Sequence, residues 1–459
     1  MEQSANSFYY SDESLVKHVH RFAPHVLDSY GFITPIVNFL FCRLKNNVWA
    51  QISYEHMEVE NYPYPVPSTT DDPVNLDDRY RLMMRHLERL NQKIAYTEPG
   101  TEQLVEAFIE RALLSYTFGE DWIAMFNLKL AITIDCIPVT LVDSVKELYL
   151  EAYGRAKGMF YPSIGNRINP PLCYSEAYMA ENPLSGRHLL ARRSLSRGEL
   201  VTREWPFVRL LTADNLLRCD YCLVYLPFAL IPCGGCSQAL YCTLTCCMRA
   251  FEEYHALECS FIGILRSHYT FLEQLGARLT LRAIRLCNGS MEQLGVLSAN
   301  RGGYNYNVPL GFNSDPRMAY GMINNLSTNR NRLKARGLFR DGAKAIGLAK
   351  LLGPEIERIY QTKNDYTLQM VVAEHLVHHL QIARVNTLYL WRSVEDPEQA
   401  TNCRTNSKPF AAVLLANGSL FNHSCVPNVH YTLEPSTGAI LFAANNDIPR
   451  NTMLNINYW

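Results

Sequence analysis

The 459-residue sequence lacks the features that would assign it to a membrane, secreted or strongly charged class of protein. No run of apolar residues approaches the roughly 18 that a transmembrane helix needs. The first twenty residues contain no apolar segment flanked by basic residues, so we expect no secretory signal. The formal net charge is −1, which gives no overall bias toward nucleic acid or anionic membranes. We therefore expect a protein of the cytoplasm and nucleus.

The sequence also lacks a clear internal repeat. Apolar residues recur at helical spacing in the segments 79–94, 101–116 and 140–159. The apolar residues that share one face in the last segment are Val145, Leu148, Tyr149, Ala152 and Tyr153. This spacing predicts a mainly α-helical region over residues 1–165. Stacked helical hairpins fit the pattern, but no period of about 34 residues supports tetratricopeptide repeats.

The cysteine distribution favours metal binding over disulfides. Of the fourteen cysteines, seven fall with one histidine into four closely spaced pairs between residues 219 and 259. The pairs are Cys219-x2-Cys222, Cys233-x2-Cys236, Cys242-x3-Cys246 and His255-x3-Cys259. A structural zinc ion takes four such ligands, so eight ligands predict two Zn²⁺ ions. Cys247, next to Cys246, is an alternative ligand.

The zinc segment has few large apolar side chains, so we expect metal binding to supply much of its folding free energy. Short runs typical of β-strands lie on both sides of it, around 186–210 and over 410–459. Arg197-Gly198 breaks the first of these regions, and residues 260–390 return to helical spacing. Strand-forming segments that flank a zinc segment and a helical block predict one discontinuous α+β domain.

The ligand spacing, together with Tyr241 before Cys242, resembles a MYND zinc finger. In that family the first and third pairs bind one ion, and the second and fourth pairs bind the other. The ligands that this resemblance implies for the first zinc are Cys219, Cys222, Cys242 and Cys246. Those implied for the second zinc are Cys233, Cys236, His255 and Cys259.

Asn422-His423-Ser424-Cys425, followed by Pro427-Asn428, is similar to a signature of SET-domain methyltransferases. Taken alone, a polar tetrapeptide after an apolar run is an ordinary turn. The order of the neighbouring blocks favours the family instead. Residues 456–458 (Ile-Asn-Tyr) stand where that family has its tyrosine strand, and 186–200 resemble its first hairpin.

A SET domain divided by a MYND finger and a helical insert is the arrangement of the SET-and-MYND protein-lysine methyltransferases. The helical N-terminal region resembles the subgroup with tetratricopeptide-type helices. The resemblance therefore implies an α+β fold with a β-rich SET domain interrupted twice. The expected segments are the N-terminal helices (1–165), the first SET part (181–218), the MYND finger (219–259), the helical insert (260–400) and the last SET part (401–459).

The resemblance also implies S-adenosylmethionine as cofactor and a lysine of a histone or another protein as substrate. The cofactor-binding residues that it implies are Arg187, His188, Asn386, Asn422 and His423. Tyr458 would be catalytic, with its hydroxyl near the transferred methyl group. Two departures favour a weaker enzyme. Gly186-Arg187-His188 replaces the usual Gly-x-Gly, and the printed sequence stops at Trp459, before the cysteine-rich post-SET segment, so we expect a truncated chain or a pseudoenzyme.

Two functions therefore compete at the level of sequence. One is a protein-lysine N-methyltransferase. The other is a weak or inactive scaffold whose finger binds proline-containing peptides, with chromatin-associated corepressors among the partners. Residues 301–350 carry nine Lys or Arg against Asp315 and Asp341. This excess favours a solvated helical face, with contact to nucleic acid or an acidic partner as the alternative.

Overall fold

The computed structural model describes residues 73–134, 136–156, 174–212, 216–287, 290, 293–295, 316–360, 366–391, 409–435 and 437–458. The predicted helical region before residue 73 lies outside these described residues. The chain divides into two units, residues 1–168 with 214–249 and residues 169–213 with 250–459. The mixed fold with a helical N-terminal region confirms the predicted α+β class.

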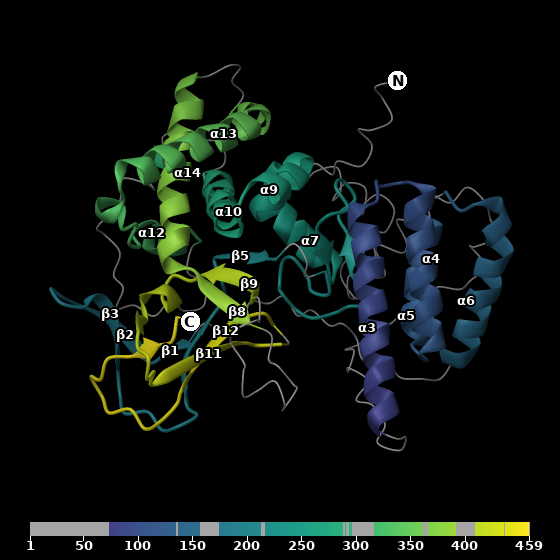
Figure 1. Ribbon diagram of the computed structural model, residues 1–459, viewed down its shortest axis with the longest axis horizontal. Helices are drawn as coiled ribbons and strands as arrows, with labels where there is room; N and C mark the ends of the chain where they lie inside the picture. The colour runs from purple at the N-terminus through teal and green to yellow at the C-terminus, as the bar shows by residue number, and fades with distance from the viewer. Residues whose placement is uncertain are drawn as a thin grey trace, which may run out of the picture. The chain divides into compact units, whose positions relative to one another are not determined.

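The helices of the first unit include three of the expected ones and one that periodicity did not indicate. Their bounds are α3 (Pro73–Tyr96), α4 (Glu102–Thr117), α5 (Asp121–Thr133), the 3₁₀ turn η3 (Val139–Leu141) and α6 (Val142–Ala156). Helices α4, α5 and α6 lie side by side (Figure 1). The predicted face of α6 is confirmed, because Val145, Tyr149 and Ala152 are buried there. Helix α5 is buried on nearly every side, so its sequence carries no amphipathic period.

The first unit also contains most of the cysteine-rich segment. Its short elements are β6 (Ile231–Pro232), β7 (Leu240–Tyr241) and α7 (Leu244–Ala250), and β6 pairs antiparallel with β7. Apart from half-buried Tyr225, residues 221–230 are buried. This segment therefore packs inside the unit and does not form a separate exposed module.

A buried arginine joins the helices of the first unit to the cysteine-rich segment. Arg111 of α4 is 0% exposed and donates to the side-chain oxygens of Asn127 (2.6 Å) and Asn91 (2.8 Å) and to the carbonyl of Leu230 (2.9 Å). Asn91 and Asn127 in turn donate to the carbonyls of Pro227 and Phe228. Burial lowers the pKa of Arg111 to about 9. These hydrogen bonds replace the water that the guanidinium loses on folding.

The second unit combines a helical block with short strands. Its helical elements are η4 (Phe251–His255), α8 (Ala256–Glu258), η5 (Cys259–Phe261), α9 (Ile262–His268), α10 (Phe271–Leu286), α12 (Pro316–Asn324), η6 (Arg330–Arg332), α13 (Ala335–Tyr360), α14 (Tyr366–Asn386) and η8 (Gly418–Leu420). Its strands are β1 (Tyr174–Ser175), β2 (Ala177–Asn182), β3 (Gly186–Ala191), β4 (Leu200–Glu204), β5 (Val208–Leu211), β8 (Leu388–Trp391), β9 (Pro409–Leu414), β10 (Asn422–His423), β11 (Val429–Leu433), β12 (Ile440–Ala444) and β13 (Asn455–Ile456).

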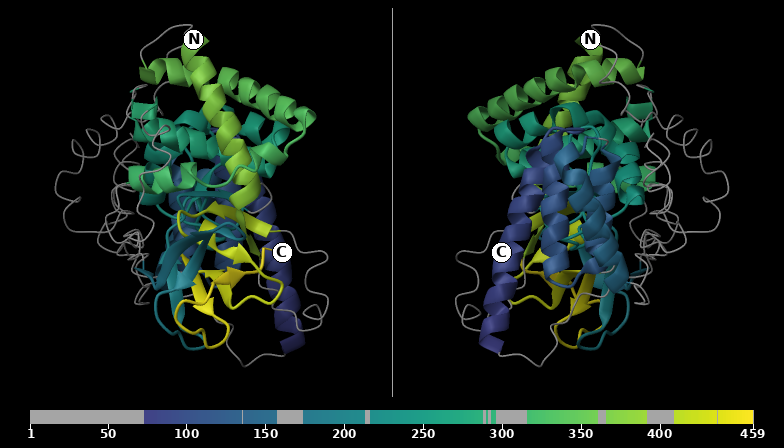
Figure 2. Two further views of the ribbon diagram at one scale, coloured as in Figure 1. Left: turned by 90° about the vertical axis from the view of Figure 1, so that its left-hand side faces the viewer. Right: turned by 90° about the vertical axis from the view of Figure 1, so that its right-hand side faces the viewer.

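The helices α10, α13 and α14 pack together on one side of the strands of this unit (Figure 2). Gly276 lets α10 and α14 approach closely, because a Cβ atom there would lie 2.9 Å from the Cα of Leu380. None of the described helices is both long and apolar enough to cross a membrane.

Strand pairing confirms that the β material on both sides of the helical block forms one domain. Strand β12 pairs antiparallel with β4, in the order β1-β4-β12-β11. A second sheet has the order β5-β9-β8, which again joins a strand before the block to strands after it. The predicted break at Arg197-Gly198 is a turn between β3 and β4, in which Gly198 has a φ of 80°.

We predict that Arg111→Met lowers the free energy of unfolding by about 2–4 kcal/mol. The change removes three hydrogen bonds of a buried cation and leaves the side-chain oxygens of Asn91 and Asn127 unpaired. Urea unfolding of the purified protein measures the change. Arg85→Met, at an exposed position of α3, is the matched control and should change stability by no more than about 0.5 kcal/mol. Equal effects of the two substitutions would contradict the structural role of Arg111.

Candidate functional site

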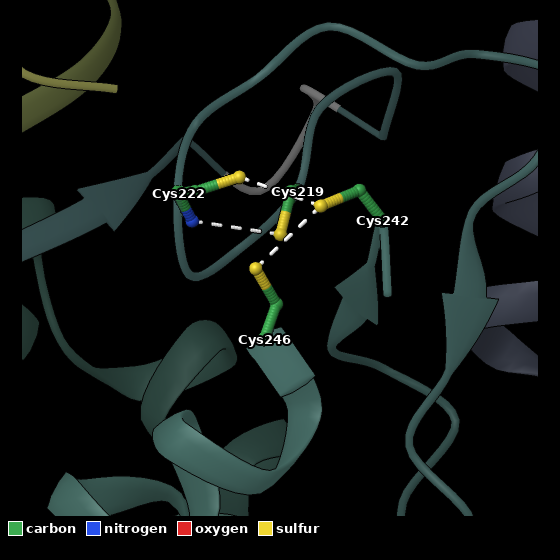
Figure 3. A group of neighbouring side chains, drawn as sticks. All are labelled: Cys219, Cys222, Cys242 and Cys246. Carbon is green, nitrogen blue, oxygen red and sulfur yellow. Dashed lines mark hydrogen bonds between the residues drawn. The ribbon is translucent and has the colours of Figure 1, made fainter. Parts of the chain in front are cut away.

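The first group of predicted metal ligands lies together in the structure. The sulfur atoms of Cys219, Cys222, Cys242 and Cys246 lie within 4.8 Å of one another and are buried. Figure 3 shows them facing a common centre, with Cys246 on α7 and Cys242 just after β7. The sulfur of Cys242 lies 3.4 Å from that of Cys222 and 3.5 Å from that of Cys246. Four sulfurs at about 2.3 Å from a tetrahedral ion would be about 3.8 Å apart, so the group fits a metal.

The two Cys-x2-Cys turns have the same backbone geometry. Leu223 follows Cys222 with a φ of 63°, and Ser237 follows Cys236 with a φ of 55°. Each of these two residues donates its N–H, at 2.9 Å, to the carbonyl of the first cysteine of its pair. A left-handed conformation costs a non-glycine residue roughly 1–2 kcal/mol. Its repetition after both pairs is consistent with turns shaped to aim two sulfurs at one ion.

The thiols of the first group cannot all ionise together without a cation. Hydrogen bonding with Cys219 raises the pKa of the Cys242 thiol well above its ordinary value, and burial does the same for Cys246. The pKa of Cys222 moves the other way, chiefly through its hydrogen bond with Cys219. Four buried thiolates in contact would repel one another strongly. A divalent cation removes this conflict, which makes the group suited to a metal.

The second predicted group, Cys233, Cys236, His255 and Cys259, also has its ligand atoms within 4.8 Å. Nδ1 of His255 lies 3.2 Å from the carboxylate of Glu258, which Arg278 contacts at 2.7 Å. Burial opposes ionisation of Glu258, but Arg278 and His255 hold its pKa at about 2. A carboxylate behind one ring nitrogen orients the other nitrogen toward a metal. Within each predicted set the four ligand atoms thus lie close to one another. Metal binding by the two sets stays a prediction.

A second candidate site forms around the Asn422-His423 strand in the other unit. Strand β10 pairs in parallel with β13, so that Asn422 lies opposite Asn455 and His423 opposite Ile456. The rings of His423 and Tyr458 are consequently 5.2 Å apart. The segment that carries Tyr458 also contacts the first hairpin, because the N–H of Leu454 donates to the carbonyl of Leu189 at 2.8 Å.

Two hydrogen bonds connect Tyr458 to His423 and to Phe421, the residue before the Asn422-His423 strand. The backbone N–H of Tyr458 donates to Nδ1 of His423 (3.2 Å). The Tyr458 hydroxyl donates to the carbonyl of Phe421 at 2.6 Å. Burial raises the pKa of Tyr458 above its ordinary value of 10, so the side chain is a neutral phenol near pH 7. Tyr458 can therefore offer its oxygen lone pairs but is not a ready general base.

Two of the other predicted cofactor residues, Arg187 and Asn386, bond the segment 325–327, directly after α12. Arg187 donates to the carbonyl of Asn325 (2.5 Å), and Asn386 donates to that of Ser327 (2.7 Å). Asn422 donates to the carbonyl of Ser185, in the turn between β2 and β3 (3.1 Å). The hairpin, the helical insert and the Asn422-His423 strand thus come together in one unit.

His188 differs from the other predicted cofactor residues because it is 4% exposed. Its Nδ1 lies 2.8 Å from the carbonyl of Gly186. Arg187, and not His188, hydrogen-bonds the helical insert. The cofactor roles of all five residues stay predictions. Sequence reasoning missed the residues that join these parts: Ser185, Glu204, Asn325, Ser327, Ser419 and Phe421. They act mostly through backbone groups, which no side-chain pattern reveals.

Comparisons with known proteins agree with this arrangement. The SET domain family model matches residues 186–459. Protein-lysine N-methyltransferase SMYD4 of Mus musculus is 33% identical over 124 residues, which cover 23% of this chain and 15% of that protein. The Gallus gallus protein of the same name is 23% identical over 325 residues, 58% of this chain and 43% of that protein. A SET and MYND domain-containing protein of Dictyostelium discoideum is 20% identical over 333 residues, 66% of this chain and 59% of that protein. The chain thus spans less than two thirds of the length of each of these relatives.

The first group of cysteines allows a test of which residue, Cys246 or its neighbour Cys247, is the metal ligand. Cys246→Ser should lower the metal content of the purified protein by one ion per chain, because it removes one sulfur of the first group. Cys247→Ser is the matched control and should leave the content unchanged, since Cys247 belongs to neither group. Elemental analysis of the purified variants measures the ratio. Loss of metal in Cys247→Ser alone would exchange the roles of the two cysteines.

Proposed function

Because this chain belongs to the SET domain family, we propose that it transfers methyl groups from S-adenosylmethionine to lysine side chains of proteins. The observation that carries the proposal is the parallel pairing of Asn422-His423 with Asn455-Ile456. This pairing brings the ring of Tyr458 against His423, although the two residues come from separate segments. The names of the relatives in mouse and chicken, both protein-lysine N-methyltransferases, support the same activity.

Methyl transfer requires the protein chiefly to position the two reactants. When bound, S-adenosylmethionine would supply a methyl group on a positively charged sulfur. The lysine nitrogen must approach this methyl as a neutral amine and in line with the carbon–sulfur bond, so positioning accounts for most of the catalysis. The neutral phenol of Tyr458 is suited to that task, because its oxygen keeps lone pairs while its hydrogen bonds Phe421. These lone pairs would stabilise positive charge near the amine.

The residues that would hold the cofactor's polar groups are Arg187, His188, Asn386, Asn422 and His423. Support for this set comes from hydrogen bonds that connect four of its members to neighbouring segments of the second unit. Asn422 bonds the hairpin turn, Arg187 and Asn386 bond the segment after α12, and His423 accepts from Tyr458.

We further propose that the two cysteine-rich groups hold Zn²⁺ in structural sites. The donor sets are four cysteines in one case and three cysteines with a histidine in the other. These are the closed ligand sets that zinc prefers, with no open position for catalysis. The expected contribution is to the folding of the segment, because each ion would hold together ligands from separate stretches of the chain.

The alternative function, a scaffold that binds proline-containing peptides through the finger, has less support. Residues 226–230 of the finger segment are buried, and helices α3 to α5 hydrogen-bond its carbonyls at Pro227, Phe228 and Leu230. Much of the segment is therefore already covered by the chain itself. Corepressor partners, nucleic-acid contact, and the cytoplasmic and nuclear location stay predictions.

Cofactor binding can be tested at Asn422. Isothermal titration calorimetry with S-adenosylmethionine should show binding by the wild type and an affinity lower by about tenfold or more in Asn422→Ala, equivalent to about 1.4 kcal/mol. The matched control is Asn445→Ala, because Asn445 also donates from its amide to a loop carbonyl, that of Pro427. The control should bind like the wild type. Equal affinities in all three proteins would remove Asn422 from the site.

Catalysis can be tested at Tyr458. Tyr458→Phe should slow methyl transfer by about 10²–10³-fold while cofactor affinity stays near the wild-type value, because the lost oxygen acts at the reacting centre. Transfer of labelled methyl groups to a pool of proteins measures the rate. Tyr431→Phe is the matched control, since its hydroxyl also donates to a backbone carbonyl, that of Tyr389. A wild-type rate in Tyr458→Phe would mean that this tyrosine is only structural.

A further inference from the structure

A buried carboxylate holds the turn that precedes the Asn422-His423 strand. Glu204, the last residue of β4, is 4% exposed. One of its oxygens accepts from the N–H groups of Ala416 (2.7 Å) and Asn417 (3.1 Å), and the other from that of Gly418 (2.8 Å). Three backbone donors thus converge on one side chain that is more than 200 residues away in sequence.

The turn has little freedom to rearrange around this carboxylate. A Cβ atom at Gly418 would lie 2.5 Å from Cδ1 of Leu415 and 2.8 Å from Cζ of Phe442, so the backbone packs directly on its neighbours. Phe421, the last residue of the turn 416–421, stacks on Phe442 with ring centroids 4.5 Å apart. Because β12 carries Phe442 and pairs with β4, the same strand pairing places both the carboxylate and this aromatic anchor.

Residues of this turn hydrogen-bond two of the predicted site residues and directly precede a third. The hydroxyl of Ser419 donates to the carbonyl of Asn386 (3.1 Å). The carbonyl of Phe421 accepts from the hydroxyl of Tyr458 (2.6 Å). Asn422 follows directly and bonds the hairpin turn at Ser185. A displacement of the turn would therefore move Asn386, Asn422 and Tyr458 relative to one another.

We propose that Glu204 is a positioning residue of the candidate active site, which fixes the turn 416–421 and through it the mutual placement of Asn386, Asn422 and Tyr458. The proposal rests on the proposed function for its consequence in cofactor binding. Glu204 does not touch the reacting groups, and it acts through the three N–H groups of the turn. Burial raises the pKa of Glu204 to about 7, which means that this position disfavours the ionised form of the side chain. A carboxyl retained under that cost is consistent with a role in site geometry.

The test compares Glu204→Gln with Thr202→Val. Glutamine keeps the volume, but its NH₂ group cannot accept a hydrogen bond, so at least one of the three N–H groups loses its partner. Thr202, also on β4, is 1% exposed and hydrogen-bonds the hydroxyl of Ser175 at 3.2 Å. Thr202→Val therefore perturbs the same strand without touching the turn, and it controls for a general loss of stability.

Two readouts separate this inference from the proposed function. In ligand-free protein, hydrogen exchange measured by mass spectrometry should speed up about tenfold or more over residues 416–424 in Glu204→Gln, but not in Thr202→Val. Calorimetry should then show S-adenosylmethionine binding that is about tenfold or more weaker in Glu204→Gln than in Thr202→Val.

The outcomes are distinct. Unchanged exchange over 416–424 in Glu204→Gln overturns the inference, whatever the cofactor result. Equal loss of affinity in the two variants also overturns it, because the effect would then be general destabilisation. Absence of S-adenosylmethionine binding by the wild type would contradict the proposed function, and the exchange experiment would still decide whether Glu204 holds the turn.

Discussion

The pairing of β4 with β12 is the constraint on which the rest of the second unit depends. It joins Leu200–Glu204 to Ile440–Ala444 across a gap of more than 200 residues. Closing a flexible loop of that length would cost about 5 kcal/mol in chain entropy. The described part of the intervening chain is largely folded, with long helices in its later part, which shortens the effective loop. The pairing sets Glu204 beside the turn at 416–418 and Phe442 beneath Phe421, and so connects the sheet to the candidate site.

Much of this architecture could be predicted from the sequence, because the decisive residues are chemically distinctive. The resemblance of the cysteine spacing to a MYND finger implied that Cys219, Cys222, Cys242 and Cys246 share one ion, and the structure groups the same four. The apolar face of α6 followed from helical periodicity, and Val145, Tyr149 and Ala152 are buried there. Strand-forming segments on both sides of the helical block indicated a discontinuous domain, which the β4–β12 pairing confirms.

The missed features share a physical reason, since they depend on burial and backbone groups more than on local pattern. Helix α5 is apolar on nearly every side, so its sequence has no periodic signal. The Arg111 network joins α4 to carbonyls near residue 230, and nothing in the sequence marks an arginine as buried. The contacts also group residues 214–249 with the N-terminal helices, so this segment shares a unit with them. No sequence pattern marks Glu204, because its partners are backbone N–H groups, which nearly every residue carries.

The protonation states at the candidate site follow from this same framework. The hydroxyl hydrogen of Tyr458 bonds the carbonyl of Phe421, and its pKa lies above the ordinary value of 10, so the side chain is a neutral phenol near pH 7. What Tyr458 can do is therefore determined by where its oxygen is held, and that depends on the position of Phe421. Phe421 is fixed by its stacking on Phe442 and by the turn that Glu204 binds. The position of the phenol oxygen thus depends on the Glu204 carboxylate, although the two groups are not in contact. The arrangement of the candidate site therefore depends on strand β4, which carries Glu204.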